Sequence, residues 1–279
     1  MVKIITDSTC NLDDEVLARH DIRVAPIAIQ FGQETFEEGV DIDRDEFYSR
    51  IERTGRIPTT SQPSPSWFER FYREVHALGH QALVITVTAK HSGTYQSAVL
   101  AKAMVPQASV EVFDSASISL GTGWMVVEAA RASERGQPLT SILDRLGHIR
   151  RHLALALTPA TLKYLQMSGR VGKLQGALAS LLDVKPIIAV RDGLLEAGDR
   201  VRTRSKAIQQ LVDYVHEQTR TATALNLAVV HARAPEDGQK LLDLARRVLP
   251  VREVLVGDLV ASLAVHGGPG VVALGAYPV

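Results

Sequence analysis

The residues with the clearest chemical potential form the octapeptide HSGTYQSA at residues 91–98. The run before it, residues 82–87, is rich in Val and Ile and predicts a buried strand. Residues 94–104 predict a helix, so Ser92 and Gly93 are expected at a strand-to-helix turn near the helix N-cap. Such a turn directs backbone N–H groups and the positive end of a helix dipole at a small anion. The alternative is that Ser92 only caps its helix.

Three more turn-like stretches carry polar side chains. They are TTSQPSPS at 59–66, SGRVGK at 168–173 and HGGPG at 266–270. If these turns converge with the first, the donors that meet are Thr60, Ser61, Ser92, Arg170 and His266. This set suits a carboxylate, which only accepts hydrogen bonds and needs several donors.

The first half of the chain alternates strand and helix patterns. Strands are expected at 2–6, 24–29, 82–88 and 109–114. Helices are expected at 12–20, 43–54, 64–79, 94–104, 119–135 and 139–151. This alternation predicts a mostly parallel sheet with helices on both faces.

The second half mixes strand directions. Strands are expected at 153–157, 184–190, 194–197, 225–232, 253–256 and 271–277, and helices at 159–167, 173–182, 205–219 and 235–248. Asp192-Gly193 supplies the positive φ angles of a hairpin turn, which implies antiparallel pairing. The predicted fold class is therefore α/β, with an N-terminal parallel α/β domain at 1–153 and a C-terminal mixed-sheet α/β domain at 154–279.

Composition excludes several classes of partner. Of 279 residues, Lys and Arg number 31 and Asp and Glu also number 31, so no net charge favours nucleic acid, and membrane contact is expected to be transient at most. The single cysteine, Cys10, cannot form an internal disulfide. With no signal-peptide pattern and no apolar run of membrane-spanning length, a cytoplasmic protein is expected.

A hydrolase or acyl-transfer enzyme using Ser92 is the main rival interpretation. Ser92 follows a strand like the nucleophile of a Gly-x-Ser-x-Gly turn, and HGG is similar to an oxyanion loop. However, Lys90 stands where that turn requires glycine, and an HGG oxyanion loop precedes its serine in the chain. We therefore assign no catalytic residue and expect a binding protein.

Two charged stretches allow other interpretations. Residues 41–52 match four positions of a calcium loop, but Glu46 replaces the required glycine, so a helix start capped by Asp41 or Asp43 is preferred and no metal is expected. The basic cluster at 200–206 is either a solvated face or a docking patch for an acidic partner or lipid head groups.

Several motifs, in order along nearly the whole chain, resemble the DegV family. They are TSQPS, SGTYQSA, FDS at 113–115, SGRVG followed by VKPII, and HGGPG. The resemblance implies two α/β domains that hold a long-chain fatty acid between them, with no cofactor besides that ligand. It also implies a role as the fatty acid-binding subunit of fatty acid kinase, which presents the carboxylate to a separate catalytic subunit. A further implied partner is an acyltransferase that uses the acyl phosphate.

The same resemblance assigns residues. Thr60 and Ser92 would bind the carboxylate, His266 would be a third polar contact, and Arg170 would lie at the head-group mouth, facing the kinase or phosphate. The remaining members of the implied ligand-binding set are Ser61, Gly93 and Gly267. The family pattern predicts threonine where Gly267 stands. Asp7-Ser8-Thr9 matches the opening strand end of the family, without an assigned role, and Cys10 also has none.

Overall fold

The computed structural model describes residues 1–171, 174 and 184–279. The chain divides into two compact units, Met1–Arg150 and Arg151–Val279. Residue 153, the predicted boundary, lies between α6 (Leu139–His152) and β8 (Ala154–Thr158).

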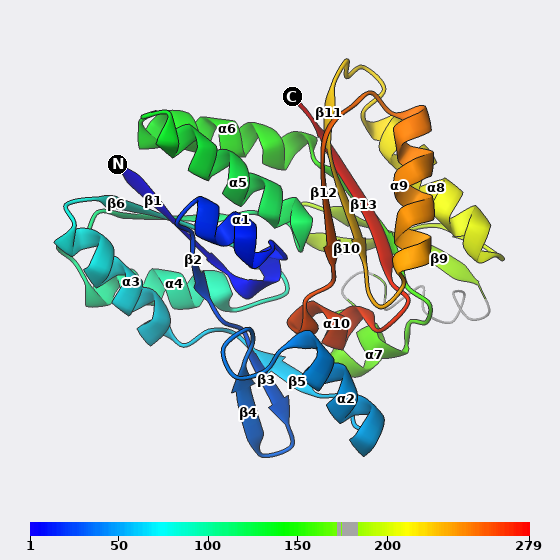
Figure 1. Ribbon diagram of the computed structural model, residues 1–279, viewed down its shortest axis with the longest axis horizontal. Coiled ribbons are helices and arrows are strands. Elements are labelled where there is room, and N and C mark those ends of the chain that lie inside the picture. Colours follow the sequence, from blue (N-terminus) through cyan, green and yellow to red (C-terminus); the bar gives the residue numbers. More distant parts are fainter. Residues whose placement is uncertain (172–173, 175–183) are drawn as a thin grey trace. The chain divides into compact units, whose positions relative to one another are not determined.

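A parallel sheet of order β2-β1-β6-β7 organises the first unit. Its strands are β1 (Val2–Asp7), β2 (Arg23–Ala25), β6 (Gln81–Thr86) and β7 (Val110–Asp114). Its helices, besides α6, are α1 (Asp14–Arg19), α2 (Arg44–Thr54), α3 (Pro65–Ala77), α4 (Thr94–Met104) and α5 (Leu120–Glu134), with a 3-10 helix at Ser8–Cys10. α3 and α4 cover one face of the sheet and α5 and α6 the other (Figure 1). The predicted parallel sheet with helices on both faces is confirmed.

A second, antiparallel sheet in this unit was not predicted. It has the order β4-β3-β5 and consists of β3 (Ala28–Phe31), β4 (Glu34–Glu37) and β5 (Thr59–Ser61). The single strand expected at 24–29 is wrong, because the chain leaves the parallel sheet at Pro26 and enters this second sheet. The loop expected at 59–66 is also wrong at its start, where Thr59–Ser61 pairs with β3. Short polar strands of this kind depend on a distant partner strand, which local sequence does not reveal.

The stretch that resembles a calcium loop begins a helix instead. Asp43 caps α2, and its Oδ1 accepts a hydrogen bond from the backbone N–H of Glu46 at 2.8 Å. The preferred capping interpretation is confirmed.

The second unit is built on a mixed sheet of order β10-β9-β8-β13-β11-β12, in which only β11 and β12 run parallel. Its strands besides β8 are β9 (Lys185–Arg191), β10 (Leu194–Val201), β11 (Leu225–His231), β12 (Val251–Asp258) and β13 (Val272–Pro278). Among the described residues, its helices are α7 (Lys163–Ser168), α8 (Arg204–Gln218), α9 (Pro235–Val248) and α10 (Ala261–Gly267). Asp192 and Gly193 have φ angles of 47° and 79°, as the predicted hairpin turn requires.

α8 and α9 pack side by side on one face of this sheet (Figure 1). Their apolar residues, including Leu211, Val215 and Leu241, join the strand residues Leu227 and Leu274 in one buried core. The helix expected at 159–167 begins only at Lys163. The helix expected at 173–182 lies outside the described residues except for Leu174.

Candidate functional site

Polar side chains gather where the parallel strands of the first unit end. β1 ends at Asp7, β6 at Thr86 and β7 at Asp114, and the carboxyl ends of parallel strands meet at one edge of a sheet. Asp114 Oδ1 accepts hydrogen bonds from the backbone N–H groups of Ala89 and Ala116 at 3.2 and 2.9 Å. This edge is therefore a network of carboxylates that hold the loops after the strands.

Asp7 is the most deeply buried carboxyl group of this edge, with no exposed surface. Its oxygens accept hydrogen bonds from Val87 N at 2.8 Å, Thr9 N at 3.0 Å and Thr9 Oγ1 at 2.5 Å. Burial raises the pKa of Asp7, because removal from water penalises the charged form more than these three donors favour it.

Ser92 and Gly93 follow β6 and begin α4. Gly93 is the N-cap residue, so the prediction that Ser92 stands near the cap is confirmed. Ser92 Oγ lies 2.8 Å from Thr94 Oγ1 and 3.3 Å from Thr94 N, from which it accepts a hydrogen bond. The Ser92 side chain is half-buried and so remains within reach of a ligand.

The segment that carries Thr60 and Ser61 meets this turn through the next residue, Gln62. A β-carbon added to Gly93 would lie 2.9 Å from Cδ and 3.1 Å from Nε2 of Gln62. Thr60 and Ser61 themselves are half-buried at the end of β5. Two of the four predicted stretches thus converge in the first unit. Gln62 was not singled out from the sequence, although its place beside Ser61 was the available signal.

His266 and Gly267 belong to the second unit. They were expected in a turn, but they are the last two residues of α10, and the turn begins at Gly268. The prediction missed this helix because it is short and its glycines resemble a loop. A β-carbon on Gly267 would lie 3.0 Å from Val271 Cγ2, so the threonine expected here would crowd Val271.

The HGGPG segment packs against the start of α7. A β-carbon on Gly268 would lie 2.2 Å from Tyr164 Cδ2, and one on Gly270 would lie 2.8 Å from Ala160 Cβ. Ser168 is the last residue of α7, and Gly169 and Arg170 follow it. Two more of the predicted stretches therefore lie at the ends of a pair of contacting helices, α7 and α10, within the second unit.

Arg170 and Arg204 have different environments. Arg170 Nη1 donates to the carbonyl oxygen of Ser168 at 2.6 Å, and the side chain is half-buried. Residues 172 and 173 of the same motif lie outside the described residues. Arg204, from the basic cluster, donates to the carbonyl oxygen of Gly270 at 2.6 Å and to Asp237 Oδ2 at 2.9 Å. Arg204 therefore anchors the HGGPG segment and is not simply a solvated charge.

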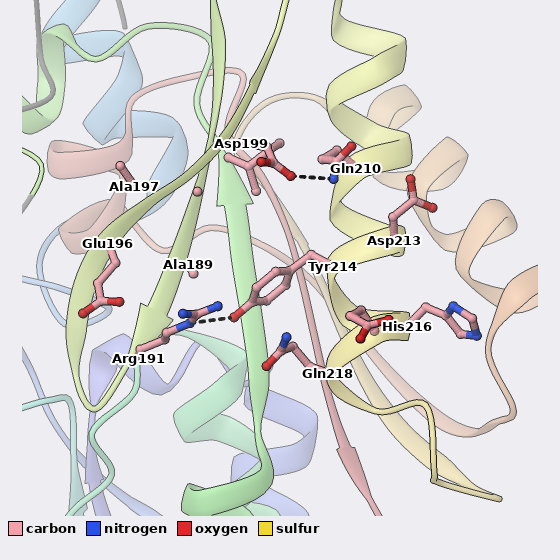
Figure 2. Close-up of a pocket in the computed structure, with 13 residues that line it drawn as sticks. Ala189, Arg191, Glu196, Ala197, Asp199, Gln210, Asp213, Tyr214, His216 and Gln218 are labelled. Atoms are coloured by element: carbon pink, nitrogen blue, oxygen red, sulfur yellow. Dashed lines mark hydrogen bonds between the residues drawn. The ribbon is translucent and has the colours of Figure 1, made fainter. Parts of the chain in front are cut away.

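A separate hollow of about 590 Å³ lies between α8 and the β9–β10 hairpin. Its walls carry the carboxylates of Glu196, Asp199, Asp213 and Glu217, and Arg191 Nε donates to the hydroxyl of Tyr214 at 3.4 Å (Figure 2). No residue predicted for carboxylate binding lines it. A wall with this many carboxylates repels an organic acid, so this hollow is not the predicted site.

Cys10 is buried beneath the same edge of the first unit. The pKa of its thiol is raised to about 12, chiefly because burial penalises the charged thiolate. The nucleophilic thiolate is therefore scarce at neutral pH. Within the described part of the chain, no group of three or more His, Cys, Asp or Glu side chains could hold a metal ion. No helix among the described residues combines the length and apolarity needed to cross a bilayer.

Comparison with known proteins covers the whole chain. A model of the DegV family of uncharacterised proteins matches residues 1–279. A DegV domain-containing protein of Caldanaerobacter subterraneus is 30% identical over 268 residues, which are 96% of this chain and 95% of that protein.

Solved structures give the same match. A DegV family protein of Thermus thermophilus, described as fatty acid binding, superposes with a TM-score of 0.93 at 32% identity, over 100% of this chain and 99% of that one. A stearic acid-binding protein of Eubacterium ventriosum superposes with a TM-score of 0.90 at 29% identity, over 100% and 98%.

Proposed function

The chain belongs to the DegV family, and on this premise we propose that it is a carrier that buries a long-chain fatty acid and holds its carboxylate with the hydroxyls of Thr60 and Ser92. The observation that carries the proposal is the contact of Gln62 with Gly93, which joins the two hydroxyl-bearing segments in a fold shared with fatty acid-binding relatives. Ser61 and the backbone N–H groups at Gly93 complete this half of the site.

The second half of the proposed site comes from the other unit. His266, Gly267 and Arg170 lie on segments brought together by α7 and α10. In the proposal, both halves face one carboxylate, so the ligand lies between the domains. His266 contributes a ring N–H and Arg170 a guanidinium, and both donate to an acceptor-only group.

Tail and head group would contribute differently to affinity. Burial of about fourteen methylenes at roughly 0.8 kcal/mol each provides on the order of 11 kcal/mol before ordering costs. Desolvation of the carboxylate costs several kcal/mol unless new hydrogen bonds replace its water. The tail therefore drives binding, and the polar residues orient the head group.

The finer proposal concerns the partner. The carrier would work in the cytoplasm with the catalytic subunit of a fatty acid kinase, which phosphorylates the presented carboxylate, and would pass the acyl phosphate to an acyltransferase. Arg170 is the residue proposed to face the kinase or the new phosphate. The carrier itself needs no catalytic residue in this scheme.

The test is organic extraction of the purified protein followed by mass spectrometry, together with binding of oleate to delipidated protein. One intact fatty acid per chain supports the carrier. An empty protein that does not bind oleate and instead turns over p-nitrophenyl esters, with turnover lost in Ser92→Ala, would establish the hydrolase alternative.

A further inference from the structure

Asp7 and Ser8 are adjacent in the chain, yet their side chains hold two different segments of the candidate site. Asp7 Oδ2 accepts the backbone N–H of Val87 at 2.8 Å, at the point where β6 leads into the loop that carries Ser92. Asp7 Oδ1 fixes the 3-10 helix at Ser8–Cys10 by accepting from Thr9 N at 3.0 Å. One buried carboxyl group therefore joins the end of β1 to the start of the Ser92 loop.

Ser8 holds the other segment. Its hydroxyl accepts the backbone N–H of Ile27 at 3.0 Å and donates to Glu38 Oε2 at 2.5 Å. Ile27 in turn accepts at its carbonyl oxygen from Glu38 N at 3.0 Å, so Ser8 and Glu38 clamp the first residue before β3.

β3 carries this anchor to the ligand residues. Ile29 of β3 pairs with Thr60 of β5, and Ala28 pairs with Ser61. Because hydrogen-bonded strands move together, a shift of the backbone at Ile27, just before β3, should pass through β3 to the Thr60 hydroxyl. The two segments then meet again where Gln62 contacts Gly93.

These contacts form a closed circuit that begins and ends at the tip of β1. We propose that Asp7 and Ser8 are positioning residues that set the separation of the Thr60 and Ser92 hydroxyls, and that they act on the fatty acid only through those two groups. This inference rests on the proposed function. It assigns a role to Asp7 at the end of β1 and to the half-buried Ser8 that follows it.

The chain offers a matched control at the opposite end of the same strand. Ser133 Oγ donates to the carbonyl oxygen of Val2 at 2.5 Å and accepts from Val2 N at 3.2 Å. Ser133 is buried, and its hydroxyl, like that of Ser8, makes two hydrogen bonds, both of them to Val2 of β1. It lies at the amino end of β1, away from the loops that carry the ligand residues.

The experiment measures oleate affinity together with the 13C signal of carboxyl-labelled oleate bound to the delipidated protein. Ser8→Ala is expected to raise the Kd for oleate about tenfold and to shift the 13C signal of the bound carboxyl group. The 13C signal of oleate labelled at its methyl end should keep its chemical shift. Ser8→Thr, which keeps a hydroxyl, should restore both readings. Ser133→Ala should lower the unfolding temperature yet keep Kd within about twofold of the parent.

A double-mutant cycle separates positioning from general weakening. If Ser8 acts through Thr60, Ser8→Ala adds little to the Kd of Thr60→Ala. The inference is overturned if the two effects are additive, or if Ser8→Ala behaves like Ser133→Ala. If Ser8→Ala does not fold, Glu38→Ala frees the same hydroxyl and enters the same comparisons. If the parent protein does not bind oleate at all, it is the proposed function that fails.

Discussion

The end of the Gln62 side chain covers Gly93, so that a β-carbon added at residue 93 would lie 2.9 Å from Gln62 Cδ. We therefore expect Gly93→Ala to push the Gln62 side chain away. Because Gln62 is exposed and flexible, the free energy of unfolding should change by less than about 1 kcal/mol. Oleate affinity should fall several-fold, because the segment that carries Thr60 and the segment that carries Ser92 lose their contact. Isothermal titration calorimetry measures this affinity.

The control for this change is the double variant Gly93→Ala/Gln62→Ala. Removal of the Gln62 side chain gives the new methyl group room, so the double variant should bind no worse than Gln62→Ala alone. A double variant that is much weaker than Gln62→Ala would contradict the steric explanation and indicate that Gly93 is needed for its own backbone.

Loss of either proposed carboxylate ligand should weaken oleate binding without unfolding the protein. Thr60→Ala and Ser92→Ala should each cost about 1–3 kcal/mol of binding free energy, because a charged acceptor loses a donor. Thr59→Ala is the matched control, since Thr59 is exposed and its hydroxyl already donates to Gln30 Oε1 at 3.1 Å. Titration of delipidated protein measures all three. Unchanged affinity in the variant lacking both hydroxyls would remove Thr60 and Ser92 from the site.

Arg170 should matter more for phosphorylation than for binding. Its guanidinium is half-buried at the end of α7 and donates to Ser168 O. Arg170→Ala is expected to reduce acyl phosphate formation with a fatty acid kinase and ATP at least tenfold, while Kd for oleate rises less than about threefold. A phosphorylation assay at saturating oleate measures the difference. Equal losses in both assays would show that Arg170 only clamps the ligand.

Gly268 should be among the costliest glycines to replace. Its φ and ψ of 74° and 169° lie in a region that only glycine adopts readily, and a β-carbon would lie 2.2 Å from Tyr164 Cδ2. Gly268→Ala should therefore destabilise the α7–α10 contact by roughly 3 kcal/mol or more, from backbone strain plus overpacking. Gly169→Ala, with a φ of 71° and open space around it, should cost about 1 kcal/mol.

Hydrogen exchange at the amides of α7 and α10 distinguishes these two glycine variants locally. The Gly268 variant should lose protection in both helices, whereas the Gly169 variant should change only the end of α7. Similar protection in the two variants would show that Tyr164 moves aside easily.

Cys10 gives the protein a specific response to alkaline pH. Its thiol pKa is raised from 9.0 to about 12 in the folded state. Above about pH 9 the unfolded chain releases this proton and the folded chain keeps it, so stability falls as pH rises toward 12. Cys10→Ala should remove the contribution of this thiol to the fall of unfolding free energy with pH. Urea unfolding of the parent and of the variant at pH 8 to 11 measures the difference. Equal slopes would show that the folded thiol ionises normally.

Features that depend on local patterns could be predicted from the sequence. Apolar runs and capping residues placed β1, β6 and α4 within a residue or two, and Asp192-Gly193 defined the hairpin, because period and turn chemistry are properties of neighbouring residues. Motif order was sufficient to indicate the family.

Features that depend on distant partners became visible only in the folded chain. β5 is a strand because β3 pairs with it, and Gln62 joins the candidate site because Gly93 leaves it room. Asp7 and Ser8 acquire a role only when Val87 and Ile27 are brought to them by the fold. These are contacts between residues far apart in the chain, and a single sequence carries no local signal for them because their energy exists only once both segments are in place.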